Sequence, residues 1–460
     1  MTDTFPASDP NPYEPVPPEP PSTTWSNGRI AALLIGFVAL VGGTFLAVSA
    51  ATGGSGGPEG AVEDLFEAIA NEDVIGVLGA IDPEERDAIE PGIRDLVGEL
   101  KRLGVFSEDL DLEAVAGVDF EFDDLEMETQ ALTEDLVAVR IVGGTATTAT
   151  DPAQAPLGRL FDDTGIRDQE ATTESDELEP GDELTLVAVR RDGWHVSLGW
   201  SILEAARGDE GFPFPDPASG LEPQGGGSPT EAVDTFIRSA AALDVERTIA
   251  LLAPGELDPL HAAAPLFLAD AQQAIEALKA QGVSIEIGSL ELADTEVEGG
   301  SRVTVEQFGV TVTAPELGTI GYEFDGECTR ITGLEDSPLL AGAPFPFAFP
   351  FGDEYCAGEV PDEANPFAGI LPETIDVGII VVERDGEWFV SPTRTLFDVV
   401  NQTLAALPDD GIDQLIGAFT GMFGFGGQEE FSVIGEEIGG AVGYSYSEEI
   451  VVEGEASGGG

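Results

Sequence analysis

The chain has 460 residues, enough for two or three domains, and its 42% hydrophobic residues can supply their cores. Its 88 acidic residues against 18 basic ones give a formal net charge of −70, which repels nucleic acid and anionic lipid headgroups. We therefore expect no nucleic-acid partner. A solvated acidic shell suited to high salt explains the charge more simply than a specific binding function does.

The N-terminal region predicts a membrane anchor. Residues 1–29 are rich in proline and are expected to form a disordered cytoplasmic tail. Residues 30–51 carry no charge and are long enough to cross a bilayer as one helix. Arg29 at the near edge, with no basic residue just beyond the far edge, predicts a single-pass protein of the cell membrane whose bulk is extracytoplasmic.

Two further interpretations of this span stay open. Residues 48–50 are similar to a signal-peptide cleavage site, but the apolar run is longer than such peptides usually have. Ala39, Gly43 and Ala47 lie four apart and would let two such helices pack as a homodimer. Chance spacing in an Ala/Gly-rich span explains these small residues as well.

The rest of the chain is duplicated. The segment 58–83, "PEGAVEDLFEAIANEDVIGVLGAIDP", matches 228–254, "SPTEAVDTFIRSAAALDVERTIALLAP", with apolar residues at helical spacing. Asp73 and Asp244 are predicted to cap a short second helix. A third helix follows and ends near Lys101 in one copy and Lys279 in the other, which are the only lysines of the chain.

Strands with alternating polarity complete each copy. Each copy ends with a version of one phrase, "RRDGWHVS" at 190–197 and "ERDGEWFVS" at 383–391. Because Asp-Gly is a tight-turn signal, we interpret the phrase as the final hairpin of the duplicated fold. The order is then three helices, two strands, a loop and two strands.

This order, with these openings and closing hairpins, resembles the nuclear-transport-factor-2-like, or cystatin-like, superfamily. The resemblance implies an α+β fold in which three helices pack on a curved antiparallel sheet to make a cone with a pocket. It covers about 58–205 and 229–400, and both copies depart from it by a long loop before the last two strands. We expect one transmembrane helix followed by two such modules, 58–206 and 229–400, joined by a Pro/Gly linker at 207–228.

The loop 328–356 and the C-terminal tail are the least regular parts. Cys328 and Cys356 are expected to form a disulfide, since a metal site would call for a histidine nearby. Four alternating phenylalanines in this loop are predicted to plug the pocket of the second module or to offer a ridge to a partner. They are Phe345, Phe347, Phe349 and Phe351. The acidic, Gly-rich tail 401–460 includes an amphipathic stretch, 411–423, that would pack on the second module or bind another protein.

Some members of the superfamily are enzymes, such as ketosteroid isomerase and polyketide cyclases. That chemistry needs a carboxylate base and an oxyanion donor, for which the second copy offers Tyr322, Glu323 and Tyr355. His195 is replaced by Phe389 in the sister copy, which favours packing over catalysis. The sequence has no nucleophile-elbow, phosphate-loop or zinc motif, so we expect neither a catalytic residue nor a metal or cofactor.

The sequence therefore favours a non-catalytic binding or scaffold protein of the cell envelope. Its partner would be an envelope protein or an apolar small ligand. The alternatives are a pocket enzyme in the second module and a passive acidic spacer.

Overall fold

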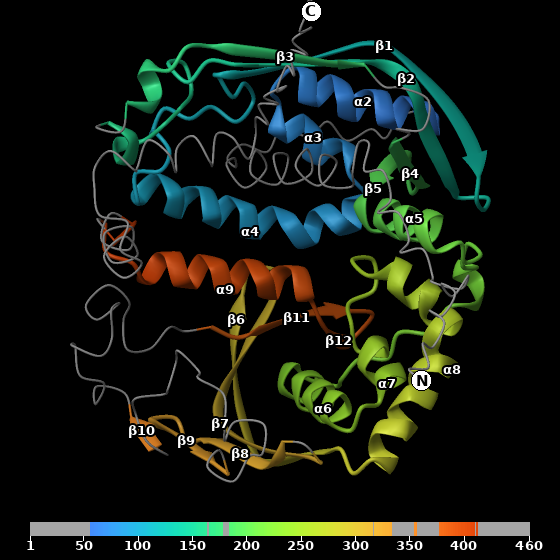
Figure 1. The fold of residues 1–460 in the computed structure, drawn as a ribbon, viewed down its shortest axis with the longest axis vertical. Helices are drawn as coiled ribbons and strands as arrows, with labels where there is room; N and C mark the ends of the chain where they lie inside the picture. Colours follow the sequence, from blue (N-terminus) through green and yellow to red (C-terminus); the bar gives the residue numbers. More distant parts are fainter. Residues whose placement is uncertain are drawn as a thin grey trace, which may run out of the picture.

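The structure is a computed structural model that describes residues 56–162, 165–177, 184–315, 317–333, 354–356, 377–409 and 411–412. This part of the chain is α+β, with two antiparallel sheets, one from each copy of the repeat. Figure 1 shows the first copy, in blue to green, above the second, in yellow to red. Helices α4 (Pro83–Arg102) and α9 (Pro392–Ala406) lie side by side between them.

The first copy contains four helices and five strands among its described residues. Its helices are α2 (Pro58–Ala70), α3 (Val74–Ala80), α4 and α5 (Leu198–Glu210). Its strands are β1 (Val118–Ala131), β2 (Leu136–Thr150), β3 (Thr172–Glu177), β4 (Leu184–Arg190) and β5 (Trp194–Ser197). The strand order is β1-β2-β4-β5, and β3 pairs with the second half of β2.

The second copy repeats this plan. Its helices are α6 (Pro229–Ala241), α7 (Val245–Ala250), α8 (Asp258–Ala280) and α9. Its strands are β6 (Ser284–Val297), β7 (Gly300–Ala314), β8 (Gly318–Phe324), β9 (Cys328–Thr332), β10 (Glu354–Cys356), β11 (Ile379–Arg384) and β12 (Glu387–Val390). The order is β10-β9-β8-β7-β11-β12, with β6 on the other side of β7. The second sheet thus has two strands, β9 and β10, beyond the five that correspond to those of the first sheet.

Local signals of the repeat are confirmed. The Asp73 carboxylate accepts a hydrogen bond from the Gly76 amide at 2.8 Å, and Asp244 accepts one from the Arg247 amide at 3.1 Å. The repeated phrase forms the hairpins β4–β5 and β11–β12. The register shifts in the strand pairing also correspond. The pairing of β1 with β2 shifts between Asp123 and Glu126, and that of β6 with β7 shifts between Ile287 and Leu290.

The prediction that three helices of each copy pack on a curved sheet is wrong. Only the first helix does so: α2 crosses β1, β2, β4 and β5, and α6 crosses β6, β7, β11 and β12. Helix α4 sends Ile93 and Val97 into the first core but lies mainly against α9. Helix α8 lies against α7 and α5, and most of its C-terminal half is exposed. The third helices thus join the two copies and do not complete a cone.

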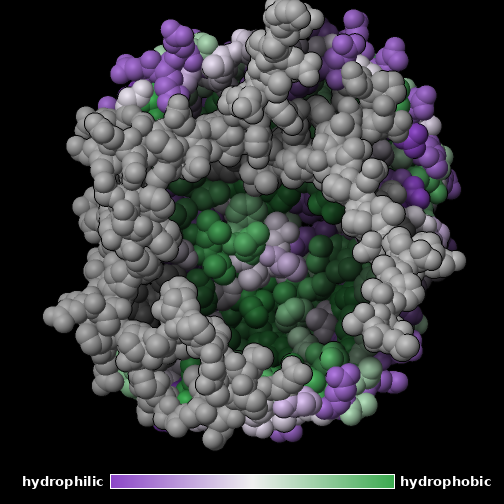
Figure 2. Space-filling view, viewed as in Figure 1, coloured by the Kyte–Doolittle hydropathy of each residue, from purple (hydrophilic) through white to green (hydrophobic). Residues whose placement is uncertain are grey.

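The contact between α4 and α9 is close. An added Cβ at Gly92 would lie 2.3 Å from Phe397, so only glycine lets the two helices approach this far. The Asn401 side-chain amide donates to the Gly92 carbonyl at 2.8 Å, and the Arg394 guanidinium donates to the Asp87 carbonyl at 2.7 Å. Figure 2 shows hydrophobic residues gathered near the centre of the face that it views.

The predicted membrane anchor needs correction. No helix in the described ranges combines the length and the apolar character needed to span a bilayer. The longest described helix, α8, has 23 residues but carries charged side chains, such as Asp270 and Lys279. The stretch 30–51 lies outside the described residues, as do the tail 1–29 and the small residues Ala39, Gly43 and Ala47. The single-pass anchor is therefore not supported, and the membrane localisation that rested on it is withdrawn.

The stretch that the sequence marks as a linker is held against the second copy. Helix α5 extends through Glu210, four residues into the predicted linker 207–228. Beyond it, the amides of Leu221, Gln224 and Gly226 donate to carbonyl groups of the second copy at 2.7–2.9 Å. These backbone bonds fix how the chain enters α6, and the bond from Leu221 to His261 places this part of the linker beside α8.

Candidate functional site

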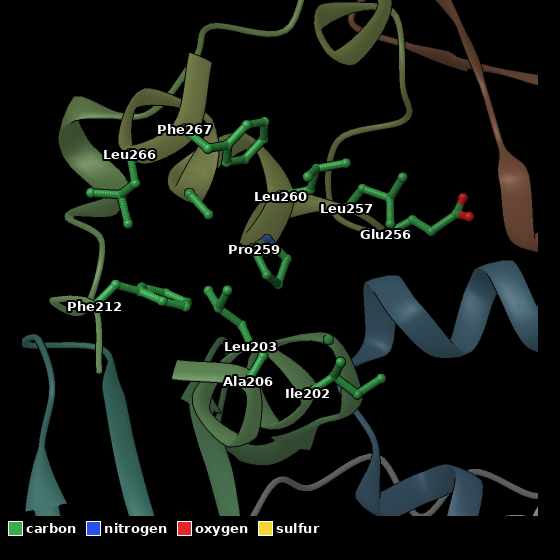
Figure 3. A pocket seen from close by; sticks show the side chains of 12 residues that line it. Ile202, Leu203, Ala206, Phe212, Glu256, Leu257, Pro259, Leu260, Leu266 and Phe267 are labelled. Atoms are coloured by element: carbon green, nitrogen blue, oxygen red, sulfur yellow. The ribbon is translucent and has the colours of Figure 1, made fainter. Parts of the chain in front are cut away.

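An apolar cleft of about 490 Å³ lies between the two copies. Helix α5 of the first copy forms one wall, the N-terminal half of α8 forms the other, and Phe212 of the linker closes one side (Figure 3). The lining residues are Gly199, Ile202, Leu203, Ala206, Phe212, Glu256, Leu257, Pro259, Leu260, Ala263, Leu266 and Phe267. Eleven of these twelve carry no charge, so the cleft offers an almost wholly apolar surface.

The cleft exists because both helices have apolar residues on more than one face. On α5, Trp200 is 4% exposed and stacks on Phe214 with ring centroids 5.5 Å apart, while Ile202 on another face is 68% exposed. On α8, Ala262, Ala263 and Ala264 are buried, and the next turn leaves Leu266 and Phe267 42% and 37% exposed. Exposed large apolar side chains that surround a cavity are typical of a binding site.

Glu256 is the one charged residue of the lining, and its carboxylate does not face the cavity. Figure 3 shows its side chain directed away from the apolar side chains of the cleft. The carboxylate accepts from the Ser391 hydroxyl at 2.6 Å and from the Thr393 amide at 2.7 Å, at the N-terminus of α9. Its hydrogen bonds are thus made to the protein, and the cleft is left without a polar anchor from this residue.

The first copy contains the same arrangement. The Glu85 carboxylate accepts from the Ser197 hydroxyl at 2.6 Å and from the amides of Leu198 and Gly199 at 2.7 and 3.0 Å, at the N-terminus of α5. Ser197 and Ser391 are the final residues of the repeated phrase. In both copies, a buried glutamate from the third helix or the turn before it caps the closing helix.

Burial raises the pKa of Glu85 to about 7, against the opposing effect of its hydrogen bonds from Ser197, Leu198 and Gly199. Since Gly199 lines the cleft, this carboxylate lies directly behind the wall that α5 forms. The pair of capping glutamates was not among the residues predicted from the sequence. The signal was present, because Glu85 and Glu256 occupy the same position of the repeat, two residues after Pro83 and Pro254.

The described residues among those singled out in the sequence do not line the cleft. Cys328 and Cys356 form a disulfide that joins β9 to β10. Tyr322 on β8 packs on Phe308 with centroids 6.1 Å apart, and Glu323 pairs with Arg330 at 3.1 Å. Tyr355 lies on β10. The phenylalanines predicted to plug a pocket, Phe345, Phe347, Phe349 and Phe351, lie outside the described residues, as does most of the predicted helix 411–423.

Both histidines are buried. His195 on β5 is 7% exposed and its counterpart Phe389 is 4% exposed, so each occupies a core position. His261 is 4% exposed, and its Nε2 lies 3.0 Å from the Ile249 carbonyl oxygen. Burial lowers the pKa of both imidazoles. Within the described ranges, no three His, Cys, Asp or Glu side chains are arranged to hold a metal ion.

Comparisons with known proteins do not extend this description, and the resemblance of the two copies to the nuclear-transport-factor-2-like superfamily stays a prediction. No protein-family model, no curated protein and no solved structure matches the chain.

Proposed function

We propose that the protein is a non-catalytic binding protein that takes an uncharged, apolar small molecule in the cleft between α5 and α8. The observation that carries this proposal is the lining itself: eleven uncharged residues around about 490 Å³, with the single carboxylate already bonded to Ser391 and Thr393. A cavity of this volume suits a drug-sized ligand. Among the described lining residues, no charged side chain faces the cavity, which favours binding over chemistry.

The negative charge of the protein favours uncharged ligands over anionic ones. The chain carries a formal charge of −70, and the twelve described residues that line the cleft include no Lys or Arg. An anionic amphiphile such as a fatty acid would therefore meet repulsion without a compensating cation. An uncharged ligand gains the burial of its apolar surface without this cost.

The test is fluorescence titration of the full chain with N-phenyl-1-naphthylamine, an uncharged apolar probe. Leu266→Asp places a charge at the mouth of the cleft and should weaken binding by about tenfold or more, since each ~1.4 kcal/mol is a factor of ten. Leu278→Asp is the matched control: it lies on the same helix, is 43% exposed against 42% for Leu266, and does not line the cleft.

Equal affinity of the two variants would contradict the proposal, as would the lack of saturable binding by the unmodified chain. A third variant, with serine at Phe345, Phe347, Phe349 and Phe351, tests the chain's own loop as the occupant. If the probe binds only to that variant, the loop fills the cleft and the small-molecule proposal fails.

A further inference from the structure

A second pocket, of about 340 Å³, lies at the far end of α4 and has the opposite character. It is formed by the end of α4, the loop that follows it, and the segment around the short helical turns η1 (Arg159–Phe161) and η2 (Ile166–Asp168). Its lining residues are Lys101, Gly104, Phe106, Ser107, Glu108, Leu157, Gly158, Arg159, Asp162 and Arg167. Three of the 18 basic residues of the chain thus line one pocket.

The walls of this pocket are tied together by the backbone. The Ser107 amide donates to the Pro156 carbonyl at 2.8 Å, the Gly158 amide to Val105 at 2.8 Å, and the Leu160 amide to Gly104 at 2.9 Å. Gly104 has φ +78°, and an added Cβ would meet the Arg159 side chain at 2.5 Å, so glycine is needed for the close approach. These hydrogen bonds therefore hold in place the backbone segments that carry the basic side chains.

Lys101 and Arg159 are oriented by hydrogen bonds that do not neutralise their positive charges. The Lys101 ammonium donates to the carbonyl groups of Glu108 and Leu110, and the Arg159 guanidinium donates to those of Arg102 and Asp409. Among the described residues, neither Lys101 nor Arg159 has a carboxylate partner. A carbonyl group fixes the position of a cation but leaves its formal charge in place.

The third cation is balanced. The Arg167 guanidinium pairs with Asp162 at 2.9 Å and also donates to the Leu157 carbonyl at 2.6 Å. The lining then contains three positive and two negative side chains, with Glu108 exposed. At physiological salt the Debye length is about 8 Å, so the more distant acidic residues of the chain are largely screened and the local charge governs binding.

We propose that this pocket binds a small oxyanion, a ligand that carries a phosphate or carboxylate group, between Lys101 and Arg159. Such groups accept hydrogen bonds from ammonium and guanidinium donors in this kind of arrangement. The proposal is independent of the apolar cleft, since the two lining sets share no residue.

The experiment is isothermal titration calorimetry of the full chain with inorganic phosphate and, separately, with citrate. Ionic strength is held constant with sodium chloride, so that screening of the acidic surface is the same throughout. We expect saturable binding of at least one of the two anions. Phosphate alone, or citrate alone, identifies which oxyanion the pocket prefers.

The two lysines of the chain provide a matched pair of variants. Lys101→Gln removes one of the two cations and should weaken binding about fivefold or more, the size of one charge contact in water. Lys279→Gln is the control: Lys279 ends α8 at the equivalent place of the repeat, donates to the Ala242 carbonyl at 2.9 Å, and does not line the pocket. It should leave the affinity unchanged.

A third variant is expected to increase the affinity for the anion, a result that loss of folding could not produce. Asp162→Asn removes the exposed carboxylate that balances Arg167 and should tighten binding by about fivefold. The proposal is overturned if the unmodified chain binds neither anion at constant ionic strength. It is also overturned if Lys101→Gln and Lys279→Gln weaken binding alike, or if Asp162→Asn fails to tighten it.

Discussion

Replacement of Glu85 by glutamine gives the sharpest test of the buried caps. Glu85 is 5% exposed, and burial raises its pKa from an ordinary 4.5 to about 7. Between these two values the folded chain keeps a proton on Glu85 that the unfolded chain releases. The folded state is therefore stabilised most below pH 4.5, and this contribution is lost as the pH rises through 7.

The size of the effect follows from the shift in pKa. A difference of 7 − 4.5, or about 2.5 units, corresponds to about 3 kcal/mol at 1.36 kcal/mol per unit. Glutamine does not titrate. The free energy of unfolding of the unmodified chain, minus that of Glu85→Gln, should thus fall by about 3 kcal/mol between pH 4.5 and a pH above 7.

The assay is urea unfolding followed by tryptophan fluorescence at a series of pH values and fixed ionic strength. Taking the difference between the two proteins removes the pH dependence of the other carboxylates. Glu63→Gln, at an exposed position of α2, controls for the loss of one charge. If the stability curves of the unmodified chain and Glu85→Gln run parallel through this pH range, burial does not perturb Glu85 and the reasoning is wrong.

Two further predictions concern stability. Reduction of the Cys328–Cys356 disulfide, or its replacement by two serines, should lower the free energy of unfolding by about 3–4 kcal/mol for a separation of 28 residues, read from the urea midpoint; an unchanged midpoint with reductant would contradict this. Gly92→Ala should lower Tm, at a cost of about 1–3 kcal/mol, because the new Cβ would lie 2.3 Å from Phe397. Gly98→Ala on the same helix meets nothing within 4 Å and should raise stability by about 0.5–1 kcal/mol, so equal shifts in Tm would argue against the close packing of α4 on α9.

The sequence predicts those parts of the fold that short-range signals control. The caps at Asp73 and Asp244 depend on residues three positions apart, and each hairpin of the repeated phrase depends on one tight turn. Both could be predicted because every determining residue is a neighbour in the chain. Comparison of the two copies then located the matching strands.

The sequence does not predict which surfaces the third helices meet. An amphipathic pattern shows that a face of α4 is buried, but it does not distinguish a sheet from another helix. The partner of Gly92 is Phe397, more than three hundred residues away, and nothing near either residue marks the pair. The cleft was missed for the same reason, since its two walls, which include Leu203 and Leu260, come from different copies.

The packing of Phe397 against the core of the first copy has a consequence for folding during synthesis. A ribosome that has made only residues 58–206 has released a module whose α4 still lacks its neighbour α9. That module can complete its core only after the second sheet has been translated and α9 has followed it. Contacts of such long sequence separation slow folding. The contact of Phe397 with the first core is therefore made only after the second copy has been translated.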